Sequence, residues 1–133
     1  MERTLVILKP DAIARKLTGD IISRFEKKNY VITRLKMAVI SKETAEEHYA
    51  HVRSESIYED MMKYITSGPS LFMILEGNKV IQTVRDMTGK TSSFDSLSGT
   101  IRGDYGSSRF ENLIHSSDSM ESAEKEITRF FKE

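Results

Sequence analysis

The sequence predicts an α+β fold: a four-stranded antiparallel sheet with helices packed on one face. Short apolar, β-branched runs alternate along the chain with stretches whose apolar residues recur at helical spacing. The order is strand, helix, strand, helices, strand, helix, strand, helix, without an internal repeat or low-complexity tract. Two successive βαβ units of this size fit the split βαβ, or ferredoxin-like, plan. With 133 residues, 38% of them hydrophobic, the chain is expected to form one domain over residues 1–133.

The first third of the chain predicts two strands around a helix. Residues 4–8 are β-branched and continuously apolar, as in a strand covered on both faces, and Lys9-Pro10-Asp11 ends the run. Residues 18–28 have one apolar stripe at helical spacing. Residues 31–39 then alternate with a period of two, which predicts a long strand with one wetter face.

The middle of the chain predicts helices on either side of a buried strand. Either Ser41 with Thr44 or Thr44 with Glu47 offers N-capping chemistry for a helix running to about residue 52. A second helical stretch over residues 57–65 ends at Ser67-Gly68-Pro69, since glycine and proline together stop a helix. The apolar run 71–75 predicts the third strand, and residues 80–87 a short amphipathic helix.

A long segment rich in Ser, Gly and Thr, residues 88–111, precedes the last two elements. Connections of this length in a compact domain are usually functional or disordered. Leu113-Ile114 predicts a short fourth strand, and residues 116–119 form a dense set of N-cap candidates. The apolar stripe over residues 120–131 then predicts the last helix.

Composition excludes several classes of protein. Twenty Lys and Arg balance twenty Asp and Glu, which argues against a protein that coats nucleic acid or anionic membrane by bulk charge. No cysteine is present, so disulfides, thiolate metal sites and cysteine nucleophiles are excluded. No apolar stretch approaches the roughly 18 residues that a membrane span needs. We therefore expect a cytoplasmic domain.

His115 is a candidate nucleophile. It lies between the fourth strand and the serine-rich helix start, where rigid elements can hold a side chain that is not fully buried. A neutral imidazole offers a nucleophilic nitrogen, and Glu121, Glu124 or Glu126 in the next helix could accept its other N–H. The alternative is a hydrogen-bonded core or capping histidine. His48 and His51 are expected on a solvated helix face, so the three histidines do not predict a zinc site.

Three cationic residues at turns are candidates for binding phosphate groups. Lys9 follows the first strand, Arg85 ends a helix, and Arg102 lies beside glycines in the long loop. Such residues can hold phosphate oxygens with charge and backbone N–H groups, although surface cations are normally just solvated. The sequence contains no GxxxxGK(S/T) element and no GxGxxG after a strand, so neither a P-loop nor a dinucleotide fold is supported.

Four blocks of the sequence together resemble the signature blocks of the nucleoside diphosphate kinase family. The blocks are residues 8–11 (LKPD), 66–69 (TSGP), 99–104 (GTIRGD) and 112–119 (NLIHSSDS). The resemblance covers essentially the whole chain, in order. It favours a catalytic role for His115, because the family carries its active histidine in an N-x-(I/V)-H-G-S-D-S block.

The resemblance implies a Mg²⁺-dependent ping-pong exchange, in which a nucleoside triphosphate phosphorylates His115 and the phosphohistidine passes the group to a nucleoside diphosphate. The resemblance assigns the phosphates to Lys9, Arg85, Thr91 and Arg102, and the ribose to Lys9 and Asn112. It places Tyr49 near the transferring phosphoryl group. Glu126 would orient the histidine, and Ser117 would stay close to it. No residue would bind Mg²⁺ directly; the nucleotide phosphates would hold it, with Asp118 helping through water.

The resemblance also implies the partners. They are nucleoside tri- and diphosphates (ATP, GTP, GDP and deoxy forms) and further copies of the chain in a hexamer or tetramer, with neither nucleic acid nor membrane. Poor base discrimination would follow if most binding energy comes from phosphates and sugar.

Several positions depart from the family pattern. Ile57, followed by Tyr58, replaces an aromatic residue that stacks on the base, and Met61 would line the same slot; ordinary helix packing is the alternative for Tyr49, Ile57 and Met61. Arg109 stands where a small aliphatic residue often closes the other side of the slot, and Ser116 replaces a glycine. Serines 93 and 98 replace prolines of the long loop, which often contributes subunit contacts.

A rival hypothesis is a ferredoxin-like ligand-sensing or nucleic-acid-binding module without turnover, because this fold hosts unrelated functions. The zero net charge and the lack of a base-stacking aromatic pair on the strands argue against it.

Overall fold

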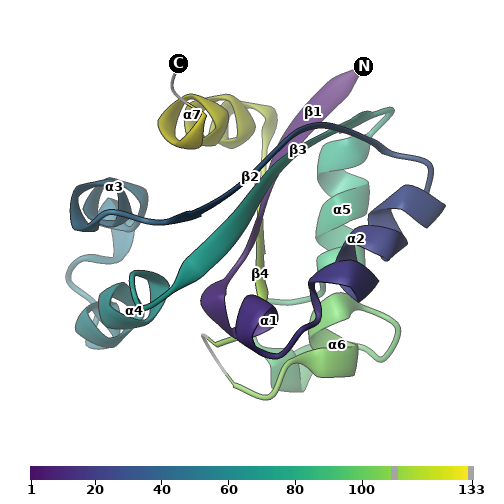
Figure 1. Ribbon diagram of the computed structural model, residues 1–133. Helices are drawn as coiled ribbons and strands as arrows, with labels where there is room; N and C mark the ends of the chain where they lie inside the picture. Colours follow the sequence, from purple (N-terminus) through teal and green to yellow (C-terminus); the bar gives the residue numbers. More distant parts are fainter. Residues whose placement is uncertain (109–110, 132–133) are drawn as a thin grey trace.

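The sheet is four-stranded and antiparallel, as the sequence predicts, with the order β2-β3-β1-β4. The computed structural model describes residues 1–108 and 111–131 (Figure 1). The strands are β1 (Glu2–Leu8), β2 (Val31–Val39), β3 (Pro69–Gly77) and β4 (Ile114–Ser116). β1 is central because it pairs on one side with β3 and on the other with β4, where Ile7 lies opposite His115.

Helices cover both faces of the sheet (Figure 1). The crossover helices α2 (Thr18–Lys27) and α5 (Val80–Thr88) lie on one face, as the ferredoxin-like plan requires. The other face carries α3 (Lys42–His48), α4 (Tyr58–Ile65) and α7 (Met120–Phe130). The ferredoxin-like fold is confirmed, but the expectation that helices lie on one face is wrong, because the segments before β3 and after β4 add three helices to the second face.

β1 explains why both faces need a cover. Val6 and Leu8 pack into the core under α2 and α5, whereas Leu5 and Ile7 pack into the core under α4 and α7. These four side chains are at most 2% exposed. The continuous apolar run therefore comes from alternate side chains that enter two different cores.

The long segment predicted as a loop contains local structure. It includes the 3₁₀ turn η2 (Ser93–Asp95) and the short helix α6 (Ile101–Tyr105). The Thr100 hydroxyl caps α6 by accepting a hydrogen bond from the Gly103 N–H at 3.0 Å. A Cβ at Gly103 would lie 1.9 Å from the Leu97 carbonyl oxygen, so only glycine allows the segment to fold back this tightly.

Two further short elements differ from the prediction: α1 was not predicted, and η1 was predicted as part of the preceding helix. The helix α1 (Pro10–Ala14) begins directly after β1 with proline in its first turn, a position that tolerates proline. The 3₁₀ turn η1 (Ala50–Val52) follows α3, which the sequence predicted as one longer helix. Ser41 is the N-cap of α3, since its hydroxyl accepts from the Thr44 N–H at 3.2 Å.

β2 is more exposed than predicted. The sequence indicated one wetter face, yet the row Val31, Leu35, Met37 and Val39, here called the β2 apolar row, is 53–60% exposed. β2 is the edge of the sheet and contains an irregularity between Ile32 and Arg34. This strand therefore presents apolar side chains and unpaired backbone groups along one edge.

Among the described residues, no helix is long and apolar enough to cross a membrane.

Candidate active site

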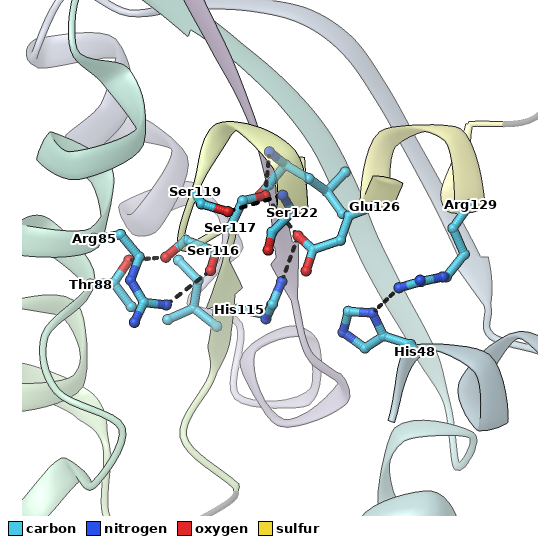
Figure 2. A network of polar contacts seen from close by, with 12 residues as sticks. His48, Arg85, Thr88, His115, Ser116, Ser117, Ser119, Ser122, Glu126 and Arg129 are labelled. Atoms are coloured by element: carbon cyan, nitrogen blue, oxygen red, sulfur yellow. Dashed lines mark hydrogen bonds and ion pairs between the residues drawn. The ribbon is translucent and has the colours of Figure 1, made fainter. Parts of the chain in front are cut away.

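His115 points from β4 toward α7, where Glu126, in the second half of that helix, meets its ring (Figure 2). The His115 Nε2 atom lies 3.0 Å from Glu126 Oε1, and the two side chains are 24% and 12% exposed. A carboxylate can only accept, so Nε2 carries the hydrogen of this contact. In the neutral ring the lone pair then resides on Nδ1, which is the nitrogen available as a nucleophile.

Ser117 supports the same carboxylate. Its hydroxyl donates to Glu126 Oε1 at 2.7 Å and accepts from the Leu5 N–H of β1 at 3.2 Å. Burial acts to raise the pKa of Glu126, but hydrogen bonds from His115 and Ser117 outweigh it and lower that pKa below its usual range. Glu126 is therefore ionised at neutral pH and fixes the orientation of the His115 ring.

Lys9 and Asn112 form a second polar pair. The Lys9 Nζ donates to Asn112 Oδ1 at 3.2 Å, and the Asn112 amide donates to the Thr91 carbonyl at 2.6 Å. Lys9 and Asn112 are buried, whereas the Thr91 side chain is exposed. Burial, and secondarily the charge of Arg102, lower the pKa of Lys9 to about 8.

Arg102 and Arg85 fix the backbone around His115. Arg102, only 6% exposed, donates to the carbonyls of Lys90 and Ile114, and so ties the long segment to β4. Its Nε is buried without a hydrogen-bond partner. Arg85 donates to the Ser116 carbonyl at 3.0 Å (Figure 2). Burial and then Arg85 lower the pKa of Arg102 to about 10, so its guanidinium stays charged.

An open cleft of about 400 Å³ gives access to His115. Its lining includes Arg85, Ser116, Asp118 and Glu126. Asp118 is exposed, and a hydrogen bond from Ser122 is the main cause that lowers its pKa.

The resemblance assigns Ile57 and Met61 to the base slot, and neither is a lining residue of this cleft. Ile57 is the N-cap of α4 and Met61 lies within that helix; both side chains are half-buried. Tyr49, also half-buried, follows α3, and burial raises its pKa to about 12, with Glu126 as a second cause. Arg109 lies outside the described residues.

Ser116 fits its position without strain. It lies in β4 opposite Val6 and is not among the described residues with positive φ. The glycine of the family pattern is therefore not required here for its conformational freedom. The Thr88 hydroxyl donates to Ser116 Oγ at 3.4 Å, which joins the end of α5 to β4.

His48 corrects a sequence-based prediction. It was expected on a solvated helix face, but it is 7% exposed and packs edge-on against the His115 ring, with 4.9 Å between centroids. Its Nδ1 accepts from Arg129 Nη1 at 2.9 Å (Figure 2), and burial, followed by the charge of His115, lowers its pKa to about 2. The sequence feature that could have indicated this burial is the spacing of His48, three positions after the buried Ala45, which places both side chains on the inner face of α3. His51 is exposed, as expected.

The resemblance implies that Lys9 holds nucleotide phosphates, and its pKa then predicts how the affinity for such a ligand depends on pH. Below pH about 8 the ammonium is charged; above it the neutral amine no longer attracts phosphate. The affinity of the free protein for a nucleoside diphosphate, measured by calorimetry between pH 7 and 10, should fall above pH about 8. A Lys9→Arg variant should keep its affinity to higher pH, because arginine stays charged. A parallel fall in both proteins would contradict this assignment.

The same shift affects stability with a defined sign. The folded pKa lies below the unfolded value of 10.5, so the unfolded chain binds more protons between pH 8 and 10.5. The cost of burying the Lys9 charge is fully present below pH 8 and fades as pH rises through this window.

The fold and the site together define a class of protein: a ferredoxin-like α+β domain whose histidine, set among buried cations, is suited to phosphoryl groups. Residues 2–133 match the family model described as nucleoside diphosphate kinase. The chain belongs to the nucleoside diphosphate kinase family and is an enzyme of the phosphotransferase class.

Relatives and solved structures agree with this assignment. The nucleoside diphosphate kinase of Acetivibrio thermocellus is 64% identical over 133 residues, which are 100% of this chain and 98% of that protein. The apo crystal structure of the Encephalitozoon cuniculi nucleoside diphosphate kinase superposes with a TM-score of 0.97 at 40% identity, covering 100% of this chain and 90% of that one. The Halobacterium salinarum enzyme in complex with CDP gives a TM-score of 0.96 at 41% identity, covering 99% and 88%.

Proposed function

We propose that this chain, acting as one domain over residues 1–133, transfers the terminal phosphoryl group of a nucleoside triphosphate to a nucleoside diphosphate through a phosphohistidine at His115. The observation that carries the proposal is the contact between His115 Nε2 and Glu126, which leaves the Nδ1 lone pair free in a neutral ring.

The two half-reactions use the same atoms. The Nδ1 lone pair attacks the terminal phosphorus, a P–N bond forms, and the P–O bond to the leaving nucleoside diphosphate breaks. The ring then carries positive charge, which the ionised Glu126 stabilises through Nε2–H. In the second half-reaction a terminal oxygen of another diphosphate attacks, and the P–N bond breaks to restore the neutral ring.

Residues around the histidine bind the nucleotide in this proposal. Arg85, Arg102, Lys9 and Thr91 hold the phosphates, and Asn112 joins Lys9 at the ribose. The unpartnered Arg102 Nε and the Lys9–Asn112 pair support these roles. Tyr49 approaches the transferring group, Ser117 holds Glu126, and Ile57 and Met61 border the base. The sequence resemblance alone assigns Arg109 to the same slot.

Mg²⁺ fits this site when it arrives with the nucleotide. Mg²⁺ prefers oxygen ligands, and Asp118 supplies an ionised carboxylate in the cleft, whereas Glu126 is engaged by His115 and Ser117. Nucleotide phosphates would provide the direct ligands, with Asp118 positioned through water, and the ion would neutralise charge on the phosphate oxygens.

The test is a pulse and chase with nucleotide labelled on its terminal phosphoryl. Purified protein is incubated with Mg²⁺ and labelled ATP, freed of nucleotide, and then mixed with unlabelled GDP. Acid-labile, base-stable label on the protein that moves to GTP supports both half-reactions. A folded protein that binds nucleotide but never acquires label would overturn the proposal and favour a binding module.

We further propose that the chain works in the cytoplasm as a homo-oligomer, a hexamer or a tetramer, on common and deoxy nucleotides and without nucleic acid. The zero net charge supports the last point. The β2 apolar row supports self-association, because an exposed edge strand of this composition can pair with a second copy.

A charge in the β2 apolar row should break this assembly. Met37→Glu replaces a 53% exposed apolar side chain and would bury a carboxylate between copies. The molar mass of the Met37→Glu assembly, measured by light scattering after gel filtration, is expected to fall below that of the parent protein. Met120→Glu, on a 65% exposed methionine at the start of α7, is the matched control and should keep the parent mass. An unchanged mass for Met37→Glu would move the interface elsewhere.

A further inference from the structure

Three side chains around the candidate nucleophile meet the chemical requirements of a transition-metal site. Within the described part of the chain, His48, His115 and Glu126 each offer a ligand atom, and these atoms lie within 4.8 Å of one another. They come from three packed elements, α3, β4 and α7. Coordination at ~2.1 Å places tetrahedral ligands ~3.4 Å apart. His115 Nε2 and Glu126 Oε1 are already 3.0 Å apart, so the largest separation, at most 4.8 Å, has to shorten by no more than ~1.4 Å.

The donor set selects the metal. Two imidazole nitrogens and one carboxylate suit Zn²⁺ and Co²⁺, whereas Mg²⁺ prefers oxygen ligands. His115 and Glu126 also line the open cleft, which leaves room for water at a fourth position. We propose that a Zn²⁺-type ion binds His48, His115 and Glu126, and that it competes with phosphorylation of His115. The competition rests on the proposed function; the binding does not.

The competition follows from the number of lone pairs on one ring. A neutral imidazole has a single nitrogen lone pair. Phosphorylation at Nδ1 uses it while Nε2–H stays on Glu126. Metal coordination at Nε2 needs the lone pair there, so the ring hydrogen moves to Nδ1, which then cannot attack phosphorus. Coordination at Nδ1 blocks the nucleophile directly.

Arg129 opposes metal binding. His48 Nδ1 accepts the Arg129 N–H at 2.9 Å, so the His48 ring hydrogen lies on Nε2 and that nitrogen has no lone pair. Coordination by either His48 nitrogen requires this hydrogen bond to break. Arg129 also places a positive charge beside the site, while Arg85 lies on the other side of His115 (Figure 2). Removal of the Arg129 guanidinium should therefore strengthen metal binding.

The experiment titrates Co²⁺ into the full chain in the presence of excess Mg²⁺ and follows the visible absorption of the bound ion. Zn²⁺ should displace it. Compared with the parent, His48→Gln and His115→Gln should bind Co²⁺ at least about tenfold more weakly, because each removes one of three ligands. Arg129→Gln should bind about tenfold more tightly, the value of a hydrogen bond from a charged group. His51→Gln, on an exposed histidine of the same cleft, should match the parent.

A second measurement separates this proposal from the proposed function. The phosphorylated protein, prepared with ATP and freed of nucleotide, should bind Co²⁺ at least about tenfold more weakly than the unphosphorylated protein. At a fixed ratio of ATP to ADP, saturating Co²⁺ should lower the equilibrium ratio of phosphorylated to unphosphorylated protein by the same factor. If no phosphoprotein forms, the proposed function fails while the binding result stands. Equal Co²⁺ affinity in the parent and His48→Gln, or weaker binding by Arg129→Gln, overturns the metal site.

Discussion

Replacing His115 with alanine is expected to lower phosphoryl transfer by at least ~10⁴-fold, the scale seen when a nucleophile is removed. Nucleotide binding should persist. The cations proposed to bind the phosphates are fixed independently of the imidazole, Arg102 by main-chain carbonyls and Lys9 by Asn112. The measurement pairs the transfer rate from ATP to GDP with the Kd for a nucleoside diphosphate.

The control for this variant is His51→Ala, which removes an exposed imidazole from the same cleft without touching the Glu126 contact. It should retain the parent rate. If His115→Ala kept substantial transfer, or if both variants lost it equally, the phosphohistidine would have to lie elsewhere.

Replacing Arg102 with methionine should produce the second large effect, on both activity and stability. The buried guanidinium donates to carbonyls on either side of the site, and these acceptors would be left unsatisfied. We expect a loss of about 2–4 kcal/mol in the free energy of unfolding. Loss of a charge on the phosphate should lower kcat/KM by ~10²–10³-fold. Urea unfolding and steady-state kinetics measure the two effects.

Arg15→Met provides the matched control. Arg15 also anchors α6, through the Tyr105 carbonyl at 2.8 Å, but it is exposed on the surface. Its loss should change the free energy of unfolding by less than about 0.5 kcal/mol and leave kcat/KM unaltered. An Arg102→Met protein with parent-like stability would show that the carbonyl contacts contribute little; one with parent-like kcat/KM would remove Arg102 from the phosphate site.

The sheet could be predicted from the sequence because its strands carry strong local patterns. The apolar run of β1 indicated burial on both faces, and the structure places its side chains in two cores. The position of the extra helices could not be predicted, because an apolar stripe shows that a helix packs without showing on which face. α6 was hidden because five helical residues inside a Ser- and Gly-rich segment leave little periodicity.

The sequence predicted contacts of the site between residues close together in the chain, but not those between residues far apart. His115 and Glu126 lie eleven positions apart, and the short path from β4 into α7 indicated that Glu121, Glu124 or Glu126 could reach the ring. Only the family resemblance singled out Glu126. His48 and Arg129 meet across 81 positions of the chain, and only the packing of α3 against α7 brings them together. Such a contact leaves no local trace in the sequence: the spacing of His48 from Ala45 could indicate its burial, but not its position beside the candidate nucleophile.

The central place of β1 has a consequence for folding kinetics. β4 pairs with β1, with Ile7 opposite His115, so the candidate nucleophile reaches its position only when the two ends of the sequence join. Closing so long a chain segment costs entropy before the pairing compensates for it, and non-local pairing of this kind slows folding. In refolding experiments we therefore expect nucleotide exchange activity to recover later than the helical signal in circular dichroism.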